Sequence, residues 1–222
     1  ERLEAEGVTV VPHPYLPYAF QISGYDHLSE LAAFQEGLFT VQDISSMLVA
    51  EIASPEAGAQ VIDVCAAPGG KALHVAEKLL LADGKMAHGN ANGNVSENGT
   101  GDTVSHVEAR DLTETKVELI RENIERTGLT NISAVCCDAS EPDQQSAGSA
   151  DLVIADLPCS GLGVIGKKPD LKYKASPDGI ESLVRLQQKI LSCVQSYVKP
   201  GGTLVYSTCT VNPAENMDNV HW

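Results

Sequence analysis

Positive charge is scarce in this chain. Its 222 residues include 15 Lys and Arg against 30 Asp and Glu, which gives a formal net charge of -15 at pH 7 and an isoelectric point near 4.6. Proteins that bind nucleic acids usually present a basic face, because cationic side chains release the counterions held by phosphates. The composition alone therefore argues against a nucleic-acid partner.

The sequence also lacks a signal peptide, an apolar run of membrane-spanning length and a metal-ligand spacing. Its 6 histidines do not pair closely with the 6 cysteines. The cysteines are scattered, without the spacing of a small disulfide scaffold. We therefore expect free thiols, no metal, no membrane association and a cytoplasmic location.

What the sequence does contain is short apolar runs that alternate with segments of helical periodicity. The length and the 43% hydrophobic content allow one sizeable core with a small appendage. The runs 61–64, 151–155 and 203–206 predict strands, whereas apolar residues at helical spacing before Gly128 and Pro200 predict helices. This alternation favours parallel crossovers, so we expect an α/β fold.

Two segments differ from this pattern. Residues 1–45 hold strand-like stretches at 8–11 and 19–22 around a proline-rich turn, and predict a small N-terminal α+β subdomain packed on the main domain. The main domain is expected over residues 46–222. Within it, residues at about 86–103 are rich in Asn and Gly and predict a flexible surface insert.

Two cysteine motifs each follow a predicted strand. Residues 156–161 read Asp-Leu-Pro-Cys-Ser-Gly, and residues 207–210 read Ser-Thr-Cys-Thr. Because ligands bind in the crevice beyond the carboxyl ends of parallel strands, Cys159 and Cys209 should face the same crevice. This pattern suggests one thiol that attacks a substrate and a second that helps to release it.

A turn of small residues at 65–71 connects a predicted strand to a predicted helix. Such a turn lets a ligand lie against backbone N–H groups at a helix N-terminus. Asp111 and Asp138 follow the next two predicted strands. A carboxylate after the next strand is the usual ligand of a ribose hydroxyl in nucleotide-binding α/β folds, so Asp111 is the candidate for that role.

Four stretches in this order, 34–46, 65–71, 156–161 and 207–210, resemble the RNA cytosine-C5 methyltransferases of the Nol1/Nop2/Sun family. That family uses S-adenosyl-L-methionine on a Rossmann-like methyltransferase sheet. The resemblance covers most of the chain from Phe34 onward. The continuation after Gly161 is most similar to the bacterial branch that modifies 16S ribosomal RNA.

The resemblance implies a role for each residue of the cysteine motifs. Cys209 would add to carbon 6 of cytosine, which makes carbon 5 able to attack the methyl group. Cys159 would assist release of the enzyme thiol. Asp156 would contact the target base beside the methyl donor, where a carboxyl group near N3 helps the ring to accept electrons.

The same resemblance implies a set of residues that contact S-adenosyl-L-methionine, with Asp111 on the ribose and Asp138 near the adenine. Lys71 also brings a positive charge near the reaction centre, where we hypothesise that it lowers a thiol pKa. The implied contacts are Cys65, Ala66, Ala67, Pro68, Gly69, Gly70, Lys71, Asp111, Asp138 and Asp156.

The acidic composition is locally reversed by lysines just after the first cysteine motif, at positions 167, 168, 172 and 174. An RNA strand would enter there. Bacterial relatives of this type also carry an N-terminal RNA-binding domain that is not in this sequence, and the sequence stops before the last strands of a methyltransferase sheet. We therefore expect part of a longer, monomeric enzyme that acts on 16S ribosomal RNA.

Three alternatives predict different observations. A transfer-RNA cytosine-C5 methyltransferase of the same family would label transfer RNA instead. DNA cytosine methyltransferases use the cysteine of a Pro-Cys pair as nucleophile, which would exchange the roles of Cys159 and Cys209. A non-catalytic RNA-binding assembly factor would bind RNA without needing Cys209.

Overall fold

In a computed structural model, the structure describes residues 1–84 and 104–222. The flexible insert predicted at 86–103 lies outside these residues. The contacts divide the chain into two compact units, and the second holds the parallel sheet.

The first unit consists of residues 1–41 and 125–128. It contains the expected pair of strands, which are antiparallel with Thr9 opposite Ser23. The guanidinium of Arg126 lies 4.0 Å from the ring centroid of Phe34 and donates to the backbone oxygens of Phe34 and Phe39. These bonds explain why residues 125–128 belong to this unit, whose boundary falls after Val41 rather than after residue 45. Its elements are α1 (Arg2–Ala5), β1 (Thr9–Pro12), β2 (Phe20–Ser23), η1 (Leu28–Glu30) and α2 (Ala32–Gln35).

The second unit is built on a five-stranded parallel sheet in the order β5-β4-β3-β6-β7. The chain starts at the central strand β3, moves outward through β4 and β5, and then returns to the other side of β3 with β6 and β7. The order of the strands reverses between β3 and β6, which is where open α/β sheets bind their ligands. The strands are β3 (Gln60–Asp63), β4 (His106–Asp111), β5 (Ile132–Cys136), β6 (Ala150–Asp156) and β7 (Val198–Ser207).

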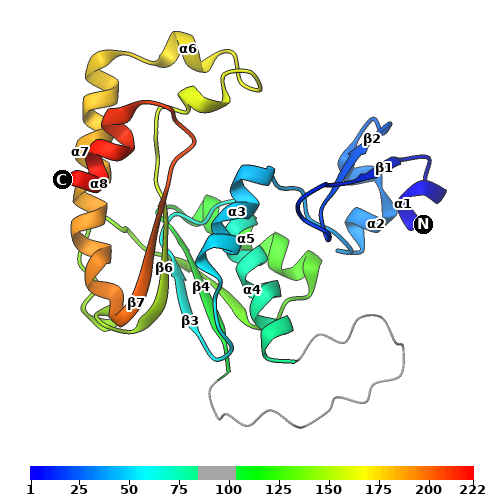
Figure 1. Ribbon diagram of the computed structural model, residues 1–222, viewed down its shortest axis with the longest axis horizontal. Helices are drawn as coiled ribbons and strands as arrows, with labels where there is room; N and C mark the ends of the chain where they lie inside the picture. The colour runs from blue at the N-terminus through cyan, green and yellow to red at the C-terminus, as the bar shows by residue number, and fades with distance from the viewer. Residues whose placement is uncertain (85–103) are drawn as a thin grey trace. The chain divides into compact units, whose positions relative to one another are not determined.

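Helices cover both faces of this sheet (Figure 1). Helices α3 (Ile44–Ala53), α4 (Gly70–Ala82) and α5 (Glu114–Thr127) lie on one side, and α7 (Pro177–Val194) lies on the other. The remaining elements of this unit are η2 (Gln144–Ser146), η3 (Leu162–Val164), α6 (Leu171–Lys174), η4 (Gln195–Tyr197), η5 (Pro213–Glu215) and α8 (Met217–His221).

The core divides into two layers because successive strand residues point to opposite faces. Val61 and Ile154 pack with Leu79 of α4 in one layer, whereas Ile62 and Val153 pack in the other with residues of α7. Burial on both faces explains why these strands read as continuous apolar runs. The α/β fold that the sequence predicts is confirmed.

Candidate active site

The structure brings the two cysteines of the motifs together. Cys159 follows β6 and Cys209 follows β7, and the last residues of these strands, Asp156 and Ser207, are register partners. The Sγ atoms of Cys159 and Cys209 are 3.3 Å apart, within hydrogen-bonding distance for sulfur. Two thiols that are 50 positions apart in the sequence are therefore in direct contact in the fold.

The hydrogen bond between these thiols shifts their pKa values in opposite directions. The hydrogen bond with Cys159 is the largest cause that lowers the pKa of Cys209 to about 6, and the charge of Lys71 is a smaller cause in the same direction. The same hydrogen bond is the largest cause that raises the pKa of Cys159. Cys209 is also the more exposed of the two, which favours its charged form. Cys209 is thus the more acidic of the two thiols, and Cys159 is the one that holds its proton more tightly.

An ion pair borders the thiols. Lys71, in the first turn of α4, places its Nζ atom 2.6 Å from Oδ2 of Asp156. The other carboxylate oxygen of Asp156 accepts a hydrogen bond of 2.7 Å from the Ser207 hydroxyl. Asp156 is therefore fixed by a residue of α4 and a residue of β7. The charge of Asp156 raises the pKa of Cys209 and so opposes the effect of Lys71.

The 65–71 turn lies between the carboxyl ends of β3 and β4. The N–H group of Ala66 donates to the backbone oxygen of Arg110 at 2.8 Å, and the N–H group of Ala67 donates to Oδ2 of Asp111 at 3.0 Å. Gly69 precedes α4 with a φ of 110°, a left-handed conformation that favours glycine. The turn therefore closes tightly before α4 begins at Gly70, and this helix has no side-chain cap at its N-terminus.

The two acidic residues predicted to contact a cofactor differ in their surroundings. Asp111 is buried, and its second oxygen accepts from the N–H group of Leu112 at 2.8 Å and lies 3.1 Å from Nζ of Lys116. Its contact with Ala67 joins it to the 65–71 turn. Asp138 is exposed, and its hydrogen bonds stay within its own turn at Ser140, which lowers its pKa. The contacts thus connect Asp111, but not Asp138, to the turn.

Asp63 is a site residue that the sequence did not reveal. It is the last residue of β3 and is 1% exposed. One of its oxygens lies 3.4 Å from the N–H group of Cys65, whereas Oδ2 has no hydrogen-bond partner in the described part of the chain. Burial is the largest cause, ahead of the charge of Asp156, that raises the pKa of Asp63 to about 7. In the sequence, Asp63 is only a polar residue at the end of an apolar run. Its burial is not visible there, because it depends on neighbours from β6 and α4.

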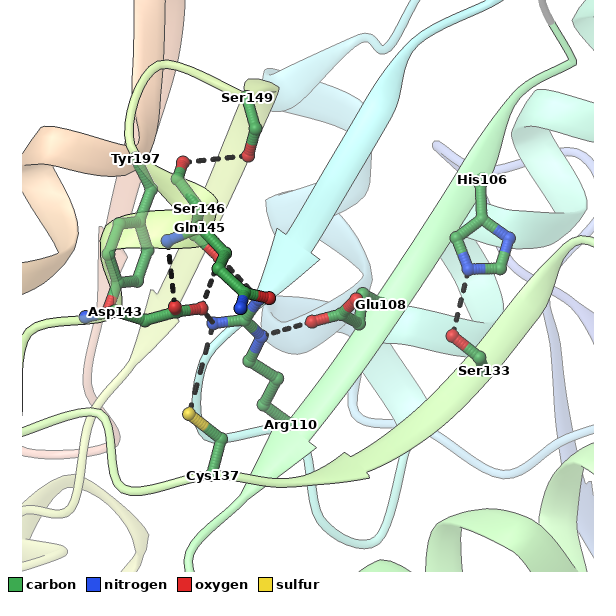
Figure 2. Close-up of polar contacts among 10 residues, drawn as sticks. All are labelled: His106, Glu108, Arg110, Ser133, Cys137, Asp143, Gln145, Ser146, Ser149 and Tyr197. Carbon is green, nitrogen blue, oxygen red and sulfur yellow. Dashed lines mark hydrogen bonds and ion pairs between the residues drawn. The ribbon is translucent and has the colours of Figure 1, made fainter.

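A cavity of about 610 Å³ lies elsewhere on the sheet, against β3, β4, β5 and the loop before β6. Figure 2 shows that its polar side chains pair with one another: Arg110 donates to Glu108, to Asp143 at 3.1 Å and to Ser146 at 2.6 Å. None of the sequence-predicted site residues lines it. The charges of this cavity are already paired, and its two free thiols, Cys136 and Cys137, contact the backbone oxygen of Leu112 and the guanidinium of Arg110.

Among residues 1–84 and 104–222, no group of three or more His, Cys, Asp or Glu side chains could hold a metal ion. No helix in those same ranges is both long and apolar enough to cross a bilayer. Lys167, one of the lysines after the first cysteine motif, forms an ion pair with Asp43.

Comparison with known proteins gives consistent results. The sequence model of the family described as 16S rRNA methyltransferase RsmB/F matches residues 100–222. Ribosomal RNA small subunit methyltransferase B of Vibrio cholerae is 35% identical over 215 residues, which cover 96% of this chain and 44% of that protein. Probable ribosomal RNA small subunit methyltransferase B of Bacillus subtilis is 40% identical over 189 residues, which cover 85% and 37%.

A solved structure resembles the chain as well. The crystal structure of NSun6 from Pyrococcus horikoshii with SFG is similar with a TM-score of 0.72 and 31% identity, over 91% of this chain and 47% of that one. The chain spans less than half the length of each of these relatives.

Proposed function

Because the chain belongs to the 16S rRNA methyltransferase RsmB/F family, we propose that it methylates carbon 5 of a cytosine in 16S ribosomal RNA through a covalent adduct of Cys209. The observation that carries this proposal is the pair of Sγ atoms 3.3 Å apart, beside the ion pair of Lys71 and Asp156. A thiolate and a thiol in contact suit a reaction that must both form and break a carbon–sulfur bond.

The first step is addition of the Cys209 thiolate to carbon 6 of the cytosine. The sulfur forms the new bond, and the ring's electron pair moves toward carbon 5 and N3. Lys71, whose Nζ atom lies 2.6 Å from Oδ2 of Asp156, would stabilise the negative charge that develops on the ring, and Asp156 would contact the base and hold the ammonium in place. The ring then carries an electron-rich carbon 5 that can take a methyl group.

S-adenosyl-L-methionine supplies the methyl group when it is bound. The residues around β3 suit such a ligand: the buried Oδ2 atom of Asp63 lacks a hydrogen-bond donor, and α4 begins without a side-chain cap. A ligand with an ammonium group and hydroxyls could satisfy such atoms. The 65–71 turn and Asp111 would hold it, and Asp138 would contact it only from the edge of the site.

The last step is release. A solvent base takes the proton from carbon 5, the electron pair of that C–H bond re-forms the ring double bond, and the bond from carbon 6 to Cys209 breaks, so that Cys209 leaves as a thiolate. A thiol of low pKa leaves faster, and the hydrogen bond from Cys159 is the largest cause of the low pKa of Cys209. Cys159 therefore assists release by stabilising the departing sulfur.

A methyl-transfer assay on separated RNAs tests the proposal. Purified 16S ribosomal RNA and transfer RNA are incubated with radiolabelled S-adenosyl-L-methionine and either the wild-type chain or the Cys209→Ala variant, and labelled nucleosides are identified after digestion. We expect 5-methylcytidine in 16S ribosomal RNA with the wild type alone. Label confined to transfer RNA, or RNA binding without transfer of label, would favour one of the alternatives.

A further inference from the structure

Glu215 is a carboxylate with no exposed surface, six positions after Cys209. It accepts hydrogen bonds from the N–H group of Ser160 at 2.8 Å, from the Ser160 hydroxyl at 2.5 Å and from the side-chain amide of Gln187 at 3.2 Å. Burying a charge is costly unless it is fully hydrogen-bonded, and these three donors meet that requirement. A fully buried carboxylate thus contacts the residue that directly follows Cys159.

The donors to Glu215 hold the loop that carries Cys159 from both sides. Ser160 directly follows Cys159 and is bound through its backbone and its hydroxyl. Gln187 of α7 also donates to the backbone oxygen of Pro158, which directly precedes Cys159, at 2.8 Å. The position of Cys159 therefore depends on Glu215 and Gln187.

Asn216, the next residue, holds the loop that carries Cys209 in the same manner. Its amide donates to the backbone oxygen of Thr210 at 2.7 Å, and its carbonyl accepts from the Thr208 hydroxyl at 2.8 Å. Thr208 and Thr210 flank Cys209. The two loops are also joined directly, since the hydroxyls of Ser160 and Thr210 are 2.9 Å apart.

We propose that Glu215 and Asn216 are positioning residues that keep the Sγ atoms of Cys159 and Cys209 in hydrogen-bond contact. Glu215 binds Ser160, the residue after Cys159, and Asn216 binds the residues on both sides of Cys209, so one short segment contacts both cysteine loops. Neither side chain contacts a thiol. This inference rests on the proposed function, because the contact of the thiols matters to catalysis only if both take part.

A loss of the Glu215 contacts would free the loop of Cys159 and weaken the bond between the thiols. The pKa of Cys209 would then rise from about 6 toward 9, because the hydrogen bond with Cys159 is the largest cause of its lowering. The charged groups that act on Cys209 from other elements, Lys71 of α4 and Asp156 of β6, would remain. The pH at which Cys209 becomes reactive thus reports the contact without any RNA.

The test measures alkylation of Cys209 by iodoacetamide across pH in this chain, with the modified peptide quantified by mass spectrometry. In Glu215→Ala we expect the midpoint of the reaction to rise by at least about one pH unit. Glu215→Gln retains an acceptor oxygen for Ser160 N–H and Gln187, and its amide can donate to the Ser160 hydroxyl. We therefore expect this conservative variant to keep the midpoint of the wild type.

The control is Asn131→Ala. Asn131 is 4% exposed and donates to the backbone oxygen of Ala76 at 2.9 Å, so its loss removes a buried hydrogen bond outside the thiol loops. We expect lower stability and an unchanged midpoint. An equal shift in Asn131→Ala, or a folded Glu215→Ala with the wild-type midpoint, would overturn the proposal.

If circular dichroism shows that Glu215→Ala does not fold, Ser160→Ala decides. That variant removes only the hydroxyl that joins Glu215 to Thr210. A raised midpoint supports the proposal, and an unchanged midpoint contradicts it. Because the assay contains neither RNA nor a methyl donor, failure of the proposed function would appear separately, as absent methyl transfer by a chain with the expected midpoints.

Discussion

The central feature at the scale of single residues is the unequal pair of thiols. Cys209 has the lowered pKa and Cys159 the raised one, and their hydrogen bond is the first cause of both shifts. The sequence motifs identified both cysteines, and they also suggested that Lys71 tunes a thiol. The dominant effect of Cys159 could not be predicted, because it depends on a distance of 3.3 Å between two loops.

The two causes can be ranked by substitution. Cys159→Ala should raise the midpoint of Cys209 alkylation more than Lys71→Ala does, because the hydrogen bond with Cys159 lowers the pKa of Cys209 more than the charge of Lys71 does. Alkylation rates from pH 5 to pH 10 measure both midpoints. A larger shift in Lys71→Ala would mean that the charge, and not the thiol contact, controls Cys209.

The raised pKa of Asp63 predicts that the free energy of unfolding depends on pH. Its pKa rises from 3.8 to about 7 on folding, so the unfolded chain releases this proton at a lower pH than the folded chain. Stability from this group is therefore present below about pH 4 and declines as pH rises toward 7, by about 4 kcal/mol over the full shift. Asp63→Asn should remove this decline.

Urea unfolding at pH 5 and pH 8 measures the effect. We expect the free energy of unfolding to fall less between these values in Asp63→Asn than in the wild type. The same fall in both proteins would show that Asp63 does not carry a raised pKa. A Glu122→Gln variant, on an exposed site of α5, serves as a control for loss of one carboxylate.

At the scale of elements, apolar runs predicted the sheet well because its strands are buried on both faces. The runs 61–64 and 151–155 correspond to β3 and β6 within a residue at each end. The start of β7 was missed: it begins at Val198, not at Thr203, because Pro200, Gly201 and Gly202 are typical of a turn. A register shift between β6 and β7 accommodates these residues.

Site residues that belong to a local sequence motif could be predicted from the sequence. Those that reach the site only through tertiary contacts could not. Both cysteines, Asp156 and the 65–71 turn are local patterns at strand ends. Glu215 and Gln187 belong to η5 and α7, and their sequence context resembles an exposed helix. Only the fold shows that both are fully buried beside Pro158 and Ser160.

The segment after Cys159 offers a matched test of how closely it approaches Cys209. The N–H group of Gly163 donates to the backbone oxygen of Cys209 at 3.0 Å, and a Cβ atom at Gly163 would lie 2.9 Å from that oxygen. Gly163→Ala should therefore displace Cys209 and lower the rate of methyl transfer by roughly tenfold or more. Single-turnover rates with 16S ribosomal RNA measure this.

Gly166→Ala is the control, since nothing lies within 4 Å of its added Cβ atom. We expect a rate near that of the wild type. Equal rates in the two glycine variants would show that the backbone at Gly163 does not position Cys209.

At the scale of the whole molecule, the net charge of -15 still argues against strong binding to RNA by this chain alone. Lys167 is engaged with Asp43, which reduces the positive charge available after the first cysteine motif. The chain spans less than half the length of the ribosomal RNA small subunit methyltransferase B relatives from Vibrio cholerae and Bacillus subtilis. The reactivity of the thiol pair can be measured without RNA, so it does not depend on how strongly this chain binds RNA.

The most direct test of the account is covalent trapping on 16S ribosomal RNA that carries 5-fluorocytosine, with S-adenosyl-L-methionine present. Fluorine at carbon 5 blocks the final loss of a proton, so the adduct accumulates and is detected by a gel shift that resists denaturant. We predict an adduct with the wild type and with Cys159→Ala, and none with Cys209→Ala. An adduct that requires Cys159 instead, or no adduct from a chain that methylates unmodified RNA, would contradict the assignment of Cys209 as nucleophile.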